Sequence, residues 1–262
     1  MLQIENLSVS YDGKNLAVDH VSLDVKRGEI VTLVGESGSG KSTLLHTILG
    51  LMPQNGSVLT GKIQLFGEDI LQTGAQRLQK MRGDQISMIF QDAGRYMNPT
   101  SRIGKQYRTF LKSHNRYSDK ECDETAIDML QRLQLQDPER VLKAYPFELS
   151  GGMCQRVAIA MAMTLRPKLL LADEPTSALD VTMQAQVIQQ MLELKKQFGT
   201  TIVMVTHNMG VAAYISDYIG VMQNGRLIER NAAKELIRHP AHAYTVSLLD
   251  SVIELEDERF AG

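Results

Sequence analysis

The chain has 262 residues, of which 43% are hydrophobic, so it carries enough apolar material to bury a core. Its net charge of −2 gives no indication of a nucleic-acid partner. No apolar stretch approaches the roughly 20 residues that a membrane-spanning helix needs, and no signal peptide is evident. Two distant cysteines form no CxxC metal site and are expected to be free thiols in a reducing cytosol. Any role at a membrane is therefore expected to need a partner.

Strand patterns dominate the first third of the chain. Alternating or continuous apolar residues predict strands there, and these fall at 4–11, 21–25, 30–34, 62–66 and 86–90. The run at 30–34 is apolar throughout, as is typical of a fully buried strand. One helix is expected at 41–51, where Gly50 and Pro53 mark its end.

Residues 92–165 lose this strand character. Apolar residues within 121–135 recur at near-helical spacing, which predicts a mostly helical segment. A helix is also expected at 181–198, and strand patterns return at 169–172, 201–206, 219–222 and 226–229. An Asn-Gly pair between the last two strands predicts a hairpin. Alternating strands and helices predict an α/β fold with a mainly parallel sheet, to which the helical segment adds a second lobe.

A glycine-rich loop connects the strand at 30–34 to the helix after it. The run from Gly35 to Ser42 fits the pattern G-x-x-x-x-G-K-[ST] in the expected context. Its glycines let successive backbone N–H groups point at phosphate oxygens, and the helix N-terminus adds its positive end. Lys41 supplies a mobile charge for the phosphates, and the Ser42 hydroxyl can ligate Mg²⁺. The alternative interpretation is a Gly/Ser-rich turn that happens to contain a lysine.

Two acids end the apolar strand at 169–172. Charged groups at the end of a buried strand are costly unless they are used, and strand carboxyl ends face the ligand crevice in such sheets. Asp173 can hold Mg²⁺ through water, and Glu174 can polarise the water that attacks the γ-phosphate. The alternative is a solvated loop start. His207 follows another strand and can reach a γ-phosphate, although a lone histidine is more often a surface or capping residue.

A second helix start resembles a phosphate site. Ser150, Gly151 and Gly152 offer a hydroxyl and free N–H groups just before an expected helix. Since one loop already cradles the phosphates, this element indicates a second face of the nucleotide, supplied across a dimer.

In this order the motifs resemble those of the ABC ATPase family, and the match spans nearly the whole chain. Gly35 to Ser42 matches Walker A, 169–174 matches Walker B, and His207 matches the switch histidine. The remaining matches are Tyr11 as the A-loop aromatic residue that stacks on adenine, Gln91 as the Q-loop glutamine, 149–153 as the signature LSGGQ with Met153 in place of Gln, and 177–180 as the D-loop.

The resemblance implies a P-loop NTPase ABC ATPase fold. Its parts are a RecA-like mixed-sheet core, an antiparallel β subdomain and a helical subdomain. A single ABC ATPase domain would span 1–262. Within it, the core and β subdomain would take 1–91 and 166–230, the helical subdomain 92–165, and a C-terminal tail 231–262.

The same resemblance assigns the site residues. Glu174, His207, Gln91 and Lys41 would be catalytic, and Ser42, Gln91 and Asp173 would hold Mg²⁺. The residues expected to bind ATP are Tyr11, Gly35, Glu36, Ser37, Gly38, Ser39, Gly40, Lys41, Ser42, Thr43, Ser150, Gly151 and Gly152. Two such subunits close face to face around two ATP molecules, so the last three would act on the partner's ATP.

Finer features resemble the peptide/nickel importer group. They are Met153, the segment 145–148, the segment 172–176, and 239–245, which looks like the group's HPxHPYT element with Ala243 in place of Pro. This implies a second ATPase subunit as partner, a paralogue or a second copy. Two membrane permease subunits and, indirectly, an extracytoplasmic solute-binding protein would complete the transporter at the cytoplasmic face of the membrane.

The cargo expectation rests on weaker features. The short tail lacks the cysteine cluster of many peptide-importer ATPases, and stretches around Gln91 and before Leu149 look like the nickel branch. We therefore expect nickel or a metal chelate ahead of short peptides. Asn208 departs from the family's usual Asp after the switch histidine, with a small expected effect.

Three other functions remain as alternative interpretations of the predicted ATPase. A soluble ABC ATPase of DNA repair or translation usually has a coiled-coil insertion or two cassettes, and neither is seen in this sequence. A regulator that no longer hydrolyses ATP is disfavoured by the presence of Glu174 and His207. An exporter motor is usually fused to its membrane spans.

Overall fold

The structure, a computed structural model, describes residues 1–114, 117–177 and 179–250. The chain forms two compact units. The first unit comprises Met1–Leu78 and the chain from Thr201 onward, and the second comprises Gln79–Thr200. The predicted helical subdomain at 92–165 therefore lies within the second unit, and the described part of the predicted tail lies within the first.

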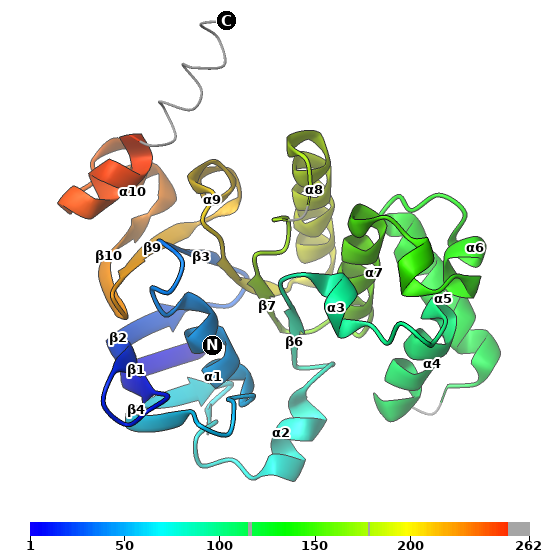
Figure 1. The fold of residues 1–262 in the computed structure, drawn as a ribbon, viewed down its shortest axis with the longest axis horizontal. Coiled ribbons are helices and arrows are strands. Elements are labelled where there is room, and N and C mark those ends of the chain that lie inside the picture. The colour runs from blue at the N-terminus through cyan, green and yellow to red at the C-terminus, as the bar shows by residue number, and fades with distance from the viewer. Residues whose placement is uncertain (115–116, 178, 251–262) are drawn as a thin grey trace, which may run out of the picture. The chain divides into compact units, whose positions relative to one another are not determined.

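One sheet of the first unit is antiparallel throughout (Figure 1). Its order is β2-β1-β4-β5, and its strands are β1 (Leu2–Ser10), β2 (Leu16–Val25), β4 (Ser57–Leu65) and β5 (Glu68–Asp69). Ile4 pairs with Leu23 on β2 and with Ile63 on β4, and all three side chains are buried. This confirms the predicted antiparallel β subdomain. The start of β4 was missed because its first residues are mostly exposed and do not alternate.

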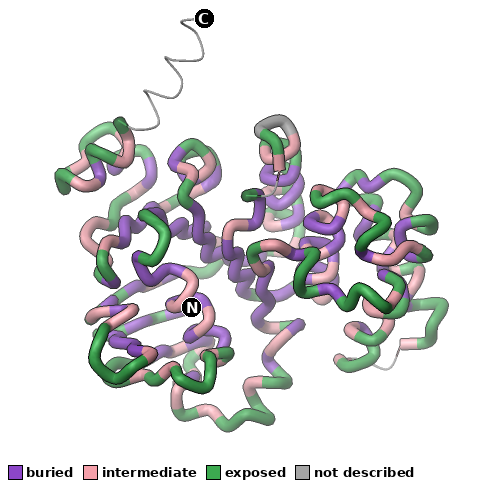
Figure 2. The backbone as a smooth tube through the Cα atoms, viewed as in Figure 1, coloured by how far each residue is buried: buried purple, intermediate pink, exposed green. Residues whose placement is uncertain are grey.

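The first unit also holds four strands of a mixed sheet. β3 (Ile30–Val34) lies between β8 (Thr201–Val205) and β9 (Tyr218–Gln223) and pairs with both in parallel. β10 (Arg226–Ala232) pairs with β9 in the antiparallel direction. Every residue of β3 and β8 is buried, as their apolar runs predict. Figure 2 shows the buried colour along the backbone where Figure 1 labels β3.

Short connections complete the first unit. The hairpin predicted between β9 and β10 is confirmed, since Asn224 and Gly225 have positive φ angles of 49° and 80°, as a type I′ turn requires. The helices are α1 (Lys41–Leu49), α9 (Met209–Ile215) and α10 (Ala233–Arg238), and residues 243–250 are also helical. The last three were not predicted from the sequence. They are too short to show a periodic apolar pattern.

The second unit is mainly helical, and it includes the segment 92–165, for which the sequence predicted mostly helical structure. β6 (Ile86–Ile89) and β7 (Leu169–Asp173) form a parallel pair. The helices are α3 (Ala93–Tyr96), α4 (Ile103–His114), α5 (Asp119–Arg132), α6 (Pro138–Lys143), the 3-10 turn η1 (Pro146–Glu148), α7 (Gly151–Thr164) and α8 (Val181–Phe198). α2 (Ala75–Met81) carries the chain from the first unit into the second.

Burial of one side of each helix holds the second unit together. α4 packs against α5 and α6, and α5 packs against α7. Tyr107 of α4 is fully buried, and its hydroxyl is hydrogen-bonded to Thr164 of α7. Both cysteines are free and buried in this unit, and burial raises the pKa of both thiols. Among the helices of the described residues, none is both long enough and apolar enough to cross a bilayer.

Candidate nucleotide site

The glycine-rich loop of the first unit connects β3 to α1. Gly35 has a φ of +147°, and a Cβ there would lie 2.1 Å from the carbonyl oxygen of Met222. Gly40 has a φ of +98°, and a Cβ there would lie 2.2 Å from the carbonyl oxygen of Ala17. Both positions therefore require glycine, for reasons of space as well as of backbone conformation. The result is a loop whose backbone can approach a phosphate closely.

Lys41 occupies the centre of this loop. Its ammonium group donates hydrogen bonds to the carbonyl oxygens of Gly35 and Glu36, at 2.8 and 2.7 Å, and to Oγ of Ser39 at 3.0 Å. The side chain is buried, with 6% of its surface exposed. Neutral acceptors of this kind are weaker partners for an ammonium than phosphate oxygens. The lysine is thus already held where an incoming phosphate would find it.

Two predicted neighbours flank the loop in the same unit. Tyr11 follows β1, and its hydroxyl donates a 3.0 Å hydrogen bond to Oγ1 of Thr43, in the first turn of α1. His207 is exposed and follows β8, whose Val205 pairs with Leu33 on β3. The loop and His207 therefore leave adjacent parallel strands at the same edge of the sheet.

Asn208, which departs from the family's usual Asp, has a structural role. Its Oδ1 accepts a 3.0 Å hydrogen bond from the backbone N–H of Val211 and caps α9. Asp and Asn are about equally effective in this position, which agrees with the small expected effect of the exchange.

The predicted carboxylates lie in the second unit. Asp173 ends β7 and is 4% exposed, and Glu174 follows with a φ of +47°. A left-handed backbone is uncommon for a residue other than glycine, and it marks the sharp turn by which the chain leaves β7. Gln91 is exposed and comes two residues after β6, which pairs with β7 through Ile89 and Ala172. All three side chains thus belong to one edge of the parallel pair.

A glutamine that the sequence patterns did not single out holds the turn after Glu174. Gln155 of α7 is 2% exposed, and its amide donates to the carbonyl oxygen of Pro175 at 2.6 Å. Gln184 of α8 donates to the carbonyl oxygen of Thr176 at 2.9 Å. The sequence could have indicated Gln155, because it is a polar residue on the apolar face of α7 and buried polar groups are almost always hydrogen-bonded.

The signature segment starts α7. Ser150 is the N-cap, and its Oγ accepts a 3.2 Å hydrogen bond from the backbone N–H of Met153. Ser150 and Gly151 are exposed. Gly152 packs on the predicted D-loop, where a Cβ would lie 3.1 Å from Cδ2 of Leu179. Within that D-loop, Ala178 lies outside the described residues, and Asp180 caps α8.

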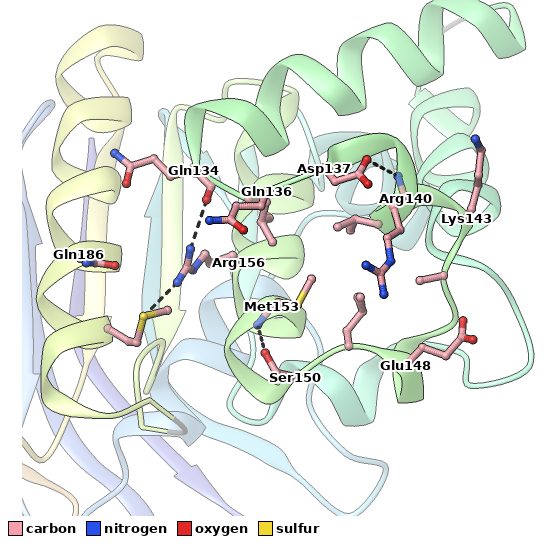
Figure 3. A pocket seen from close by; sticks show the side chains of 15 residues that line it. Gln134, Gln136, Asp137, Arg140, Lys143, Glu148, Ser150, Met153, Arg156 and Gln186 are labelled. Atoms are coloured by element: carbon pink, nitrogen blue, oxygen red, sulfur yellow. Dashed lines mark hydrogen bonds between the residues drawn. The ribbon is translucent and has the colours of Figure 1, made fainter.

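A cavity of about 810 Å³ opens beside the signature (Figure 3). Ser150, Met153 and Arg156 line one part of it, and Asp137 and Arg140 line another. The Arg156 guanidinium donates to the carbonyl oxygen of Gln134 and to the sulfur of Met183, but its Nε is buried and has no hydrogen-bond partner among the described residues. Burial lowers the pKa of Arg156.

The predicted site residues thus fall into two sets. The first unit brings together Tyr11, the glycine-rich loop from Gly35 to Ser42, Thr43 and His207. The second unit holds Gln91, Asp173, Glu174 and the signature residues. The loop geometry fits a polyphosphate, with Lys41 among backbone groups that only glycines permit.

Comparison with known proteins identifies the family. The model of the ABC transporter family matches residues 18–177. Over 258 residues the chain is 43% identical to the probable D,D-dipeptide transport ATP-binding protein DdpD of Escherichia coli, and the match covers 97% of this chain and 79% of that relative. It is 42% identical to the oligopeptide transport ATP-binding protein OppD of Salmonella typhimurium, over 98% of this chain and 78% of the relative.

Comparison with solved structures indicates the same family. A dimeric structure of a post-hydrolysis state of the ATP-binding cassette MJ0796, bound to ADP and Pi, matches with a TM-score of 0.80 and 29% identity. That match covers 89% of this chain and 99% of the other. The chain therefore belongs to the ABC transporter family and is an ATP-hydrolysing, ATP-binding subunit.

Proposed function

We propose that one ATP is held by the glycine-rich loop of this chain and cleaved with the help of Glu174. The observation that carries the proposal is the position of Lys41. Its ammonium lies among three acceptors of a loop in which Gly35 and Gly40 permit close backbone approach. Bound triphosphate offers charged oxygens to this ammonium, and the N-terminus of α1 adds its positive end. Tyr11, fixed by Thr43, stacks on the adenine.

The donor set proposed for Mg²⁺ consists of oxygens only. Ser42 supplies a hydroxyl, Gln91 an amide and Asp173 a buried carboxylate. Hard oxygen ligands are those that Mg²⁺ prefers, usually together with phosphate and water. When bound, the ion neutralises charge on the phosphates. Glu174 takes a proton from the attacking water at its carboxylate, and His207 orients toward the γ-phosphate.

We further propose that the signature completes the site of a partner ATPase subunit. Ser150 and Gly151 are exposed at the start of α7, where backbone N–H groups can meet an anion. The related cassette with bound ADP and Pi is described as dimeric, which supports this arrangement. The partner is a paralogue or a second copy of this chain.

We propose that the complete transporter imports di- or oligopeptides. The sequence features ranked nickel or a metal chelate first, whereas the relatives reported above are described as D,D-dipeptide and oligopeptide transport proteins. A further relative of 40% identity is the dipeptide transport ATP-binding protein DppD of Lactococcus lactis. In this proposal the chain binds two permease subunits at the cytoplasmic face of the membrane. A solute-binding protein delivers the cargo on the other side.

Two experiments test the loop assignment and the cargo separately. The first measures MgATP hydrolysis by the purified chain and by Lys41→Ala, with Lys168→Ala as a control far along the sequence. Loss in the first variant alone supports the loop assignment, and undiminished hydrolysis in Lys41→Ala contradicts it. The second reconstitutes the chain with its permeases and binding protein. Stimulation by oligopeptides supports the cargo, and stimulation by nickel alone overturns it.

A further inference from the structure

The hydroxyl of Tyr244 reaches the phosphate loop from the other end of the chain. It accepts a 3.0 Å hydrogen bond from the backbone N–H of Glu36, which is 208 positions earlier in the sequence. Both residues belong to the first unit. Tyr244 lies in the segment that resembles the importer group's tail element, for which the sequence offered no role. The tail thus contacts the phosphate loop within the first unit.

The peptide group that Tyr244 contacts is the one that Lys41 holds from its other end. The N–H of Glu36 and the C=O of Gly35 belong to a single planar peptide. Its oxygen accepts from the Lys41 ammonium at 2.8 Å, while its N–H donates to Tyr244. Rotation of this peptide would break both bonds at once. Gly35, at a φ of +147°, is the residue at which such rotation would be easiest.

Glu229 on β10 fixes the segment that carries Tyr244. Its carboxylate accepts hydrogen bonds from the backbone N–H of Ala241 at 2.8 Å and of His242 at 3.0 Å. It also accepts from the Thr245 hydroxyl at 2.5 Å, and Thr245 is completely buried. Burial opposes ionisation, but these bonds outweigh it and hold the pKa of Glu229 below its usual value. The segment is therefore anchored on both sides of Tyr244.

Apolar contacts add a second anchor. Tyr244, Leu248 and Leu249 pack against a buried cluster of the first unit. That cluster includes Val34, the residue directly before Gly35, and Ala212 of α9. The tail therefore packs on the end of the strand that delivers the phosphate loop. This places the Tyr244 ring by packing and leaves its hydroxyl to make the polar contact.

We propose that Tyr244 is a positioning residue for ATP binding. It fixes the Gly35–Glu36 peptide, so that the loop and Lys41 are in place before the phosphates arrive. Preorganisation of this kind raises affinity because less order must be created on binding. Tyr244 does not touch the reacting atoms in this arrangement. Its hydroxyl should therefore affect the affinity for ATP much more than the turnover of bound ATP. The inference rests on the proposed role of the loop in holding ATP.

The test is Tyr244→Phe in the full chain, because it removes the hydroxyl and keeps the packed ring. A hydrogen bond of this type is worth a roughly threefold to tenfold change in equilibrium. We expect MgATP to bind that much more weakly in calorimetric titrations, and KM to rise with kcat nearly unchanged. The control is Tyr218→Phe, which removes a tyrosine hydroxyl at the start of β9. It should bind ATP as the wild type does.

Two outcomes would overturn the inference. One is wild-type affinity for ATP in Tyr244→Phe, whether or not the melting temperature falls, and the other is a fall in kcat with unchanged KM. Glu229→Gln provides an independent approach, since it loosens the anchor and should weaken ATP binding in the same direction. If Glu229 acts through Tyr244, the double variant should bind ATP no more weakly than Tyr244→Phe, and additive losses would contradict this link. If the wild type itself fails to bind ATP, the proposed role of the loop fails instead.

Discussion

The side-chain amide of Gln155 donates a 2.6 Å hydrogen bond to the backbone carbonyl of Pro175, one residue after Glu174. Gln155 belongs to α7, the helix that the signature Ser150 caps. One rigid helix thus carries the proposed contact with the partner's ATP and also holds the turn that follows the proposed catalytic carboxylate. A displacement of α7 would therefore shift the turn that follows Glu174 in the same unit.

Gln155→Leu should destabilise the protein and slow hydrolysis. The variant keeps the size of the side chain but leaves the buried carbonyl of Pro175 without its donor, at a cost of about 1–3 kcal/mol. Thermal unfolding and MgATP turnover measure the two effects. Gln131→Leu, at an exposed position of α5, is the matched control. Wild-type stability in Gln155→Leu would show that water replaces the amide.

Glu174→Gln should bind MgATP and hydrolyse it very slowly. Binding rests on Lys41 and the loop backbone, whereas the activation of water rests on the carboxylate. Trapped ATP should also favour a closed dimer, which size-exclusion chromatography with MgATP would detect. Glu124→Gln, in an exposed ion pair with Lys120, should behave as the wild type does. Turnover at the wild-type rate in Glu174→Gln would remove this residue from the mechanism.

Tyr11→Ala should weaken ATP binding by about fivefold, because ring stacking contributes on the order of 1 kcal/mol. Tyr11→Phe keeps the ring and loses only the bond to Thr43, so its affinity should fall less. Competition with a fluorescent ATP analogue measures both. Equal losses would assign the effect to the hydroxyl. Lower stability with unchanged affinity would make Tyr11 a packing residue alone.

Ser150→Arg should leave ATP binding to the isolated chain intact and abolish hydrolysis that depends on dimer formation. The bulky cation removes the cap of α7 and occupies the face that we assign to the partner's ATP. Ser113→Arg places the same charge on α4, elsewhere in the second unit, as a control. Weaker binding of ATP by the isolated Ser150→Arg chain would place this serine in the chain's own site.

Local patterns were sufficient for much of this fold. Residues next to one another in sequence determine three of its features. These are the buried strand before Gly35, the positive-φ glycines of the loop and the Asn224-Gly225 turn. Short helices such as α9 were not predicted, because seven residues cannot display helical periodicity clearly. Asp173 and Glu174 were found because a charge at the end of a buried strand is conspicuous.

The hydrogen bonds that support the site residues could not be predicted from local sequence patterns. Tyr11 and Thr43 are 32 positions apart, and Tyr244 and Glu36 are 208 apart. Hydrogen bonds between residues so far apart in sequence depend on which strands become neighbours in the sheets. A single sequence does not show which strands these are. Gln155 was identifiable only as a polar residue on an apolar face, and its acceptor became clear with the turn at Pro175.

The two glycines of the phosphate loop also limit how the protein can be redesigned. Gly40 abuts Ala17 on β2, and Gly35 abuts Met222 on β9, so the loop touches one strand of each sheet in the first unit. A protein engineer who wished to widen the loop for a bulkier phosphate ester could not do so with a substitution inside it. Both strands would have to be rebuilt together, which makes the neighbouring sheets the place to begin.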